Sequence, residues 1–439
     1  MRLRVRLRVR GMGGGAMSVL PRHLLPDTAE VGPDGALRIG GCDVAVLAEE
    51  FGTPLFVYDE AHLRARCREA VDAFGDGVAY ATKAFLCRAM ARLAHEEGMH
   101  LDVASGGELA VALAAGVPAA RLVLHGNNKS DDELRSARAA GVGRIVVDSF
   151  DELDRLERLH AEDGIVPKVL LRTTPGVEAH THEFVMTGQD DSKFGFGLKV
   201  GDAARAVERA GSSVAVELVG LHAHIGSQVF VAGFFEQAVE ALAPFVIECG
   251  LPELSIGGGI GVAYVEGEEA PSIAAWGTVV RSACEAAGIT ARVSAEPGRS
   301  IAAAAAVTLY RVGTVKEVPG IRTFVAVDGG FIDNPRPALY GSGYETFDPA
   351  RVEADRTEVV RLVGKHCESG DVIVPEAKLP PGVGVGDLVA TPVTGAYGRS
   401  MGSNYNLLHR PAVVFVRDGE ARLVIRRETD DDLLATDVG

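Results

Sequence analysis

The feature that most constrains the fold is a regular alternation, across residues 78–302, of short β-rich runs with alanine- and leucine-rich segments of helical period. Several of the helical segments are followed by glycine, the residue with which helices commonly end. Eight such units predict a closed parallel (β/α)8 barrel, and an open doubly wound sheet is the alternative. The expected strands are 78–83, 100–105, 121–126, 144–149, 168–173, 217–226, 253–259 and 292–299.

Chemically suggestive residues stand at the carboxyl ends of the expected strands, where barrel enzymes build their active sites. Lys83 ends the first strand, after the apolar run 78–81. A lysine at the point where a buried strand opens into a loop can be desolvated enough to supply the neutral amine that Schiff-base chemistry requires. A carbonyl cofactor is therefore the first hypothesis. The residues expected to share one pocket are Lys83, Asp102, His125, Arg172, His224, Gly257 and Glu296.

Two further motifs follow the seventh and eighth expected strands. The run Gly257, Gly258, Gly259, Ile260, Gly261 would allow backbone N–H groups to approach a phosphate. A glycine run is often only a tight turn, but its place after strand seven favours phosphate binding. Glu296 and Arg299 form either a surface ion pair or a pair in which the carboxylate keeps a pyridine nitrogen protonated and the guanidinium binds an anionic substrate group. Together with Lys83, these motifs imply pyridoxal phosphate.

After Ile301 the helical period fades and β-rich segments follow, ending in a hairpin signal at Asp418-Gly419. Residues 37–46 also alternate, so the amino-terminal segment is expected to join this part of the chain. The sequence thus predicts a second, β-rich domain of sandwich or barrel type. The expected division is a disordered extension over 1–16, with Met1 or Met17 as the start, a barrel over 53–302, and a β-rich domain from 17–52 and 303–439.

Composition limits the classes of function. A formal charge of −16 disfavours nucleic acid and anionic membranes as partners, and no apolar run approaches the roughly 18 residues of a membrane span. Six cysteines without paired spacing indicate neither a disulfide framework nor a zinc site, which fits a cytoplasmic protein. The loop with His180, His182 and Glu183 is interpreted as a lid or dimer element, so no metal is expected.

Beside the glycine loop, six motifs stand out: YATKA at 80–84, HAHIGSQ at 222–228, EPGR at 296–299, NPRPALY at 334–340, CESGD at 367–371 and GAY at 395–397. The first three, with the glycine loop, resemble those of the barrel-type (fold type III, alanine-racemase type) pyridoxal phosphate-dependent decarboxylases. The last three narrow the resemblance to the diaminopimelate decarboxylase family. The resemblance covers residues 36–416.

The resemblance implies decarboxylation of meso-2,6-diaminopimelate to L-lysine and CO2, the last step of lysine biosynthesis, with pyridoxal 5'-phosphate as cofactor. Lys83 would form the Schiff base with the cofactor, His224 would stack on its ring, and Glu296 would pair with the ring nitrogen. His222, two residues from His224, could be confused with it. The phosphate would be held by Ser227, Gly257, Gly258, Gly259, Gly261 and Tyr397.

The resemblance also implies how the far end of the substrate is held. That end would contact Arg299, Arg336, Tyr340, Glu368 and Tyr397. Cys367 resembles the candidate proton donor of the family, a role that Lys83 could also fill. In such enzymes the residues corresponding to Cys367 and Glu368 come from the other subunit, so a homodimer with shared active sites is expected.

Other functions remain open at this point. A decarboxylase of ornithine, arginine, carboxynorspermidine or a specialised diamino acid would keep the fold, but Arg299 and Arg336 disfavour a cationic distal group. A racemase is expected to leave the ring nitrogen less protonated, so Glu296 disfavours it. A non-catalytic cofactor carrier would not need the second domain, which holds Cys367 and Glu368.

Overall fold

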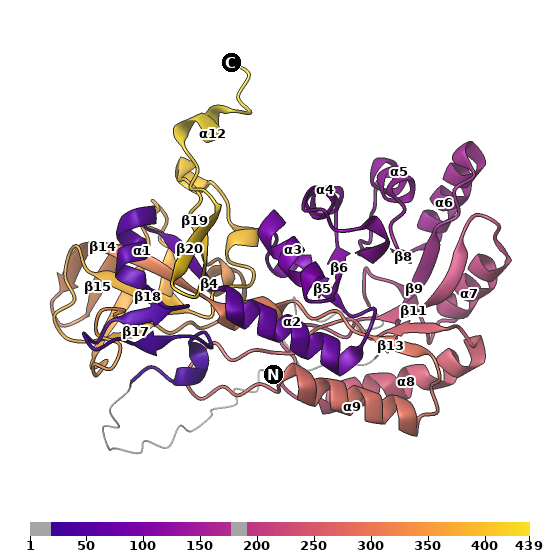
Figure 1. The fold of residues 1–439 in the computed structure, drawn as a ribbon, viewed down its shortest axis with the longest axis horizontal. Helices are drawn as coiled ribbons and strands as arrows, with labels where there is room; N and C mark the ends of the chain where they lie inside the picture. The colour runs from indigo at the N-terminus through magenta and orange to yellow at the C-terminus, as the bar shows by residue number, and fades with distance from the viewer. Residues whose placement is uncertain (1–18, 177–190) are drawn as a thin grey trace, which may run out of the picture.

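The computed structural model describes residues 19–176 and 191–439. The chain forms two lobes side by side, one built of strands ringed by helices and the other mostly of strands (Figure 1). The predicted disordered extension over 1–16 and the loop with His180, His182 and Glu183 lie outside the described residues.

The first lobe is a closed parallel barrel, as the sequence predicted. Its eight strands pair in the order β13-β12-β11-β9-β8-β7-β6-β5, and the short β10 (Phe196–Gly197) pairs with β9. Two backbone hydrogen bonds close the ring, from Ala79 N–H to the Ala295 oxygen (2.9 Å) and from Ala81 N–H to the Pro297 oxygen (3.1 Å). The strands are β5 (Ala79–Ala81), β6 (His100–Val103), β7 (Leu122–Leu124), β8 (Arg144–Val147), β9 (Lys168–Thr174), β11 (Glu217–Ala223), β12 (Glu253–Ser255) and β13 (Arg292–Ser294).

Helices surround the barrel, and local sequence signals set their ends. Ser105, Ser130 and Ser149 each accept a hydrogen bond from the backbone N–H three residues later, which caps the helix that follows a strand. Gly141 and Gly250 adopt the left-handed conformation that ends a helix. The helices are α2 (Glu60–Phe74), α3 (Arg88–Glu96), α4 (Gly106–Ala114), α5 (Asp131–Ala140), α6 (Phe150–Asp163), α7 (Asp202–Ser212), α8 (Gly233–Cys249) and α9 (Ile273–Ala286).

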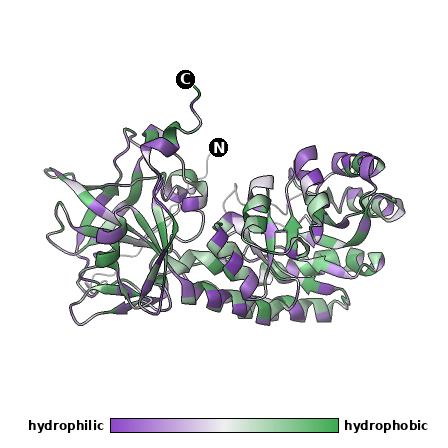
Figure 2. Cartoon of the chain, turned by 45° about the horizontal axis from the view of Figure 1, so that its top comes forward, coloured by the Kyte–Doolittle hydropathy of each residue, from purple (hydrophilic) through white to green (hydrophobic). Residues whose placement is uncertain are grey.

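The barrel strands bury both of their faces. Val123, Val146, Leu170 and Val219, from four neighbouring strands, form a small hydrophobic cluster separate from the main core. Because side chains alternate along a strand, this cluster fills the barrel interior while the alternate residues pack against the helices. Figure 2 shows that the helices carry both hydrophobic and hydrophilic residues. An amphipathic helix turns the hydrophobic ones toward the core. None of the helices in the described parts of the chain has the length and apolar character needed to cross a bilayer.

The second lobe is built on a sheet in the order β17-β16-β15-β14-β4-β19-β20, with β18 also paired to β14. The long β14 bends through the sheet and pairs with β4, β15 and β18. A left-handed turn at Asp418 and Gly419 joins β19 to β20, the hairpin that the sequence indicated. The strands are β4 (Leu55–Asp59), β14 (Ala306–Val318), β15 (Arg322–Val327), β16 (Glu358–Val363), β17 (Val372–Leu379), β18 (Leu388–Pro392), β19 (Ala412–Arg417) and β20 (Glu420–Ile425).

The position of β4 differs from the domain boundary expected at residue 53. This strand pairs with β14 and β19 in the second lobe, not with the barrel. All five of its residues are buried, so it has no alternating pattern that could show which sheet it joins. The barrel's share of the chain therefore begins with α2.

The amino-terminal segment also contacts the second lobe. Its small sheet of β1 (Glu30–Val31), β2 (Leu37–Ile39) and β3 (Cys42–Asp43) is followed by α1 (Val44–Phe51). Leu37 N–H donates to the Pro349 oxygen, and Gly419 N–H donates to the Gly40 oxygen, each at 2.7 Å.

Candidate active site

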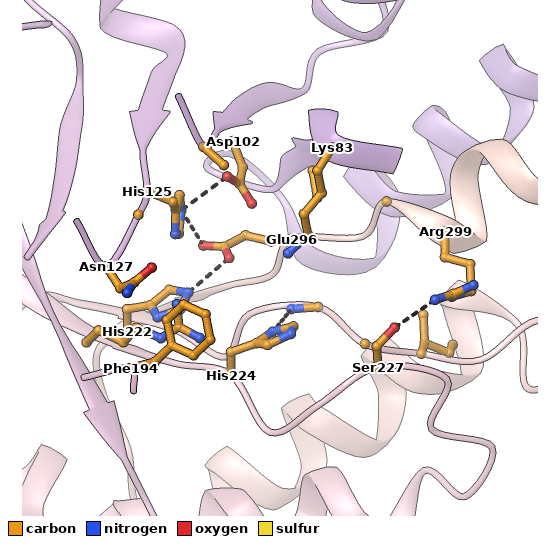
Figure 3. A pocket seen from close by; sticks show the side chains of 18 of the residues that line it. Lys83, Asp102, His125, Asn127, Phe194, His222, His224, Ser227, Glu296 and Arg299 are labelled. Carbon is orange, nitrogen blue, oxygen red and sulfur yellow. Dashed lines mark hydrogen bonds and ion pairs between the residues drawn. The ribbon is translucent and has the colours of Figure 1, made fainter. Parts of the chain in front are cut away.

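A cavity of about 310 Å³ opens at the carboxyl ends of the barrel strands. Of the seven strand-end residues expected to share a pocket, six line this cavity, and Gly257, which packs against His224, does not. Figure 3 shows the labelled side chains converging on it from different strands. The six are Lys83, Asp102, His125, Arg172, His224 and Glu296.

Lys83 lies in a 3-10 turn (Thr82–Ala84) that follows β5, rather than in the strand itself. The Thr82 hydroxyl, 2.8 Å from the Asp102 carbonyl oxygen and 2.8 Å from Glu108 Oε2, holds this turn against β6. The Lys83 side chain projects into the cavity and is exposed. The turn thus places the Lys83 side chain at the cavity rather than within the packed strand, and its desolvation stays a prediction.

Glu296 is the most heavily contacted carboxylate of the cavity. Its Oε1 accepts a hydrogen bond from the Ser255 hydroxyl (2.8 Å), and its Oε2 lies 2.9 Å from His222 Nε2. Burial alone would raise the pKa of Glu296, but His222 and His125 outweigh it and place the pKa well below its usual value. Burial also lowers the pKa of His222, to about 4, so this ring is neutral at pH 7 and donates through Nε2–H.

His125 lies between two carboxylates. Its Nε2 is 3.6 Å from Asp102 Oδ1 and 3.5 Å from Glu296 Oε1, and its ring meets that of His222 edge to face. Burial would lower the pKa of His125, but the charges of Asp102 and Glu296 outweigh it and raise this pKa. Burial raises the pKa of Asp102 to about 6. Atoms of His125, His222 and Glu296 lie within 4.8 Å of one another, a spacing that would also suit a metal ion, although the sequence indicated none.

His224 has a fixed orientation. The backbone N–H of Gly258 donates to its Nδ1 (3.1 Å), so the proton of the neutral ring is on Nε2. Burial, with the nearby charges of Lys83 and Arg172, lowers the pKa of His224 well below its usual value. The ring therefore faces the cavity as an uncharged, oriented plane.

The glycine loop packs closely on neighbouring strand ends. A Cβ added to Gly258 would lie 2.2 Å from the Glu296 carbonyl oxygen, and one added to Gly259 would lie 2.1 Å from the Gly226 oxygen. Gly258 and Gly259 line the cavity, whereas Gly261 lines a separate surface hollow. Gly257 adopts a φ of 67°, in the left-handed region.

Ser227, Tyr397 and Arg299 form one end of the cavity. Arg299 donates from Nη2 to the Ser227 hydroxyl (3.0 Å) and from Nη1 to the Tyr264 hydroxyl (2.8 Å). Its guanidinium also lies over the Tyr397 ring, 4.6 Å from the centroid. Arg336, in α11 (Arg336–Tyr340), contacts the same cluster from the second lobe, with Cζ 3.5 Å from the Tyr264 ring centroid.

Four side chains expected at the site do not line this cavity. Arg336 is buried against the ring of Tyr264, and Tyr340 is partly exposed at the end of the same helix. Cys367 and Glu368 are exposed on the second lobe. Cys367 N–H donates to the Asn406 side chain, and Glu368 Oε1 accepts from Gly370 N–H. Within one chain, then, the second lobe contributes Tyr397 to the cavity lining.

Sequence reasoning assigned no role to Ser255 or Tyr264 and left His222 as a possible confusion with His224. A weak signal existed for Ser255, because a serine two residues before the glycine run interrupts an apolar strand. The separate role of His222 depends on the distance between β11 and the end of β13, which no local pattern gives.

Comparison with known proteins defines the class. Residues 60–303, more than half of the chain, match the family described as "Pyridoxal-dependent decarboxylase, pyridoxal binding domain". A barrel of this kind, with a lysine, an ionised buried carboxylate and a glycine loop at its mouth, is that of the pyridoxal-dependent decarboxylases.

The chain is 48% identical to diaminopimelate decarboxylase of Mycobacterium tuberculosis, over 96% of this chain and 98% of that protein. It is 47% identical to the Bacillus subtilis diaminopimelate decarboxylase, over 94% and 98%. The structure of the M. jannaschii diaminopimelate decarboxylase in complex with L-lysine superposes with a TM-score of 0.88 at 32% identity, over 94% and 98%. The chain belongs to the diaminopimelate decarboxylase family.

Proposed function

We propose that this protein decarboxylates meso-2,6-diaminopimelate to L-lysine and CO2, with pyridoxal 5'-phosphate as cofactor. Relatives of this name cover nearly the whole chain, and one related structure contains L-lysine. The observation that carries the proposal is a pair of guanidiniums that both contact Tyr264: Arg299 lines one end of the cavity, and Arg336 is buried against the Tyr264 ring. Two cations suit a substrate with a distal carboxylate.

The residues present fit the cofactor. Ser227, Tyr397 and the close-packed loop at Gly258 and Gly259 offer donors suited to a phosphate, and Glu296 is a buried, ionised acceptor suited to a protonated ring nitrogen. We therefore assign the cluster of His125, His222 and Glu296 to the cofactor ring rather than to a metal ion. When bound, pyridoxal phosphate supplies an aldehyde that condenses with amines and a pyridinium ring that accepts the electron pair left by a departing carboxylate.

The side chains around the cavity each have a separate role in the proposed reaction. Lys83 supplies the amine at the cavity mouth, and its exposed Nζ is free to move a proton to or from the reacting carbon. His224 presents an uncharged face whose orientation Gly258 fixes. Ser255 and His222 hold the two oxygens of Glu296, so this carboxylate stays ionised and cannot rotate away from the ring nitrogen.

The distal group of the substrate is both a carboxylate and an ammonium, and the proposed partners match it. Arg299 and Arg336 would hold the carboxylate, with Tyr340, and Glu368 would hold the ammonium. A structure of a lysine/ornithine decarboxylase from Vibrio vulnificus is also similar, at 25% identity and a TM-score of 0.72. Two guanidiniums would repel the cationic end of ornithine or arginine, which supports diaminopimelate instead.

We also propose a homodimer in which Cys367 and Glu368 complete the active site of the other chain, with Cys367 as a proton donor. The support is that both residues are exposed and lie outside the cavity of their own chain. Exposed residues that resemble site residues of the family need a second chain to reach a cavity.

The test is CO2 release by the purified, cofactor-loaded protein. The panel is meso-diaminopimelate, ornithine, arginine and carboxynorspermidine, and the Lys83→Ala variant is the control for chemistry at the site. We expect turnover of meso-diaminopimelate at least 100-fold above the others, as the loss of a charge-assisted distal contact implies. Preferential release from carboxynorspermidine would reassign the substrate, and no release from any of them would refute the proposal.

A further inference from the structure

One tyrosine contacts both arginines proposed to hold the substrate. The Tyr264 hydroxyl accepts a hydrogen bond from Arg299 Nη1 at 2.8 Å. The face of its ring lies against Arg336, with the guanidinium carbon 3.5 Å from the ring centroid. Arg299 comes from the barrel and Arg336 from the second lobe, so Tyr264 joins a cation of each lobe.

The segment that carries Tyr264 is fixed to the second lobe. The Tyr264 ring meets that of Tyr344 edge to face, with centroids 5.7 Å apart. Two residues on, Glu266 N–H donates to Glu345 Oε1, and Glu266 accepts from Lys378 Nζ at 3.2 Å. Buried Arg356 pairs with Glu345 at 3.0 Å and ties this part of the second lobe together. Tyr264 is thus a fixed point between the lobes, although it belongs to the barrel.

The arginine of the second lobe has unused hydrogen-bonding capacity. Arg336 is 5% exposed, and within the described residues its buried Nη1 has no hydrogen-bond partner. A buried guanidinium with an unmet donor costs stability unless something binds it. A carboxylate between Arg336 and Arg299 would satisfy that donor.

We propose that Tyr264 is a positioning residue that sets substrate specificity by holding Arg299 and Arg336 at a spacing that receives one carboxylate. Two guanidiniums repel each other, and the phenol oxygen and the negative face of the ring reduce that repulsion before the substrate arrives. The hydroxyl orients Arg299, and the ring supports Arg336. The proposal rests on the function proposed above and adds the group that prepares the distal pocket.

The experiment compares two ligands that differ only in the distal carboxylate. L-lysine carries this carboxylate, whereas cadaverine has the same chain and both amines but lacks it. Binding of each to the cofactor-loaded enzyme is measured by calorimetry for the wild type, Tyr264→Phe and Tyr264→Leu. The control is Tyr58→Phe, which removes a buried hydroxyl that donates to the Gly395 oxygen at 2.8 Å, outside the cavity lining.

Tyr264→Phe should weaken L-lysine binding about threefold because Arg299 loses its orienting oxygen, and Tyr264→Leu should weaken it about tenfold or more because Arg336 also loses its support. Cadaverine binding should change less than twofold in both variants. With meso-diaminopimelate, KM should rise by a larger factor than kcat falls. Tyr58→Phe should leave the ratio of L-lysine to cadaverine affinity unchanged.

The two proposals fail in different ways. A wild-type enzyme that turns over meso-diaminopimelate, but whose preference for L-lysine over cadaverine is unchanged in Tyr264→Phe and Tyr264→Leu, overturns the role of Tyr264 alone. If Tyr264→Leu does not fold, Tyr264→Phe still decides the question. A wild type that releases no CO2 and binds both ligands equally overturns the proposed function, and the role of Tyr264 with it.

Discussion

Two buried groups of the active site should oppose each other in the pH dependence of stability. Burial raises the pKa of Asp102 from 3.8 to about 6 and lowers the pKa of His222 from 6.5 to about 4. Asp102 therefore contributes stability that is fully present below about pH 4 and is lost as the pH rises through 6. His222 contributes stability that is fully present above about pH 6.5 and is lost as the pH falls through 4.

The two contributions are similar in size. Each shift of two units or slightly more corresponds to about 3 kcal/mol of unfolding free energy. Between pH 4 and 6.5 the two opposite changes in unfolding free energy nearly cancel in the wild type. Substitution of either residue should therefore make the pH dependence due to the other one measurable. On going from pH 6.5 to 4, which covers most of each titration, Asp102→Asn should lose about 2 kcal/mol relative to the wild type, and His222→Gln should gain about 2 to 3 kcal/mol relative to it.

The measurement is urea unfolding of the cofactor-free protein at half-unit steps from pH 4 to 7. Trp276 is the only tryptophan of the chain, and it is buried in α9 against Phe74 and Phe235, so its fluorescence reports on the barrel. Titrating groups remote from the site cancel in the difference between each variant and the wild type, so the sign of its slope reports on the substituted residue together with its neighbours His125 and Glu296. Difference curves that are flat, or that slope in the same direction for both variants, would refute the assignment of opposite shifts.

Three further outcomes are expected. Arg336→Ala should raise KM for meso-diaminopimelate at least tenfold because it removes a buried cation from the distal pocket, and unchanged steady-state kinetics would exclude Arg336 from the site. Lys83→Ala and Cys367→Ala chains, each inactive alone, should recover about a quarter of wild-type activity when mixed and reassociated, since half of the dimers then hold one intact site; no recovery would contradict shared sites. Gly258→Ala should weaken cofactor binding more than tenfold in equilibrium dialysis, because the new methyl group would lie 2.2 Å from a backbone oxygen, whereas Gly211→Ala, with nothing within 4 Å, should bind normally.

The barrel and much of its site could be predicted because both depend on local order. The period of the strands and helices is a local property, and the closed barrel brings the strand ends together, so Asp102, His125 and Glu296 could be placed in one pocket without knowing any distance. The contacts of Glu296 with His222 and Ser255 could not be predicted from the sequence, because they depend on how closely three strands approach one another.

The remaining differences also have physical causes. Lys83 is exposed because a 3-10 turn intervenes after the strand, which a hydrophobic run cannot reveal. The predicted domain boundary at residue 53 placed β4 in the barrel, because the burial of all five of its residues is compatible with either sheet. Tyr264 acts through two arginines about 35 and 72 positions away, and no periodic pattern connects residues so far apart.

The place of β4 bears on how this protein is made. The strand leaves the ribosome early, yet one of its neighbours, β14, begins some 250 residues later, and the other, β19, forms close to the end of synthesis. During translation its five mostly apolar residues must remain unpaired, or be shielded by a chaperone, while the barrel is synthesised and folds. A truncated messenger RNA whose product ends before residue 412 would therefore yield a chain with a complete barrel. Its second lobe would keep an unpaired, aggregation-prone sheet edge at β4.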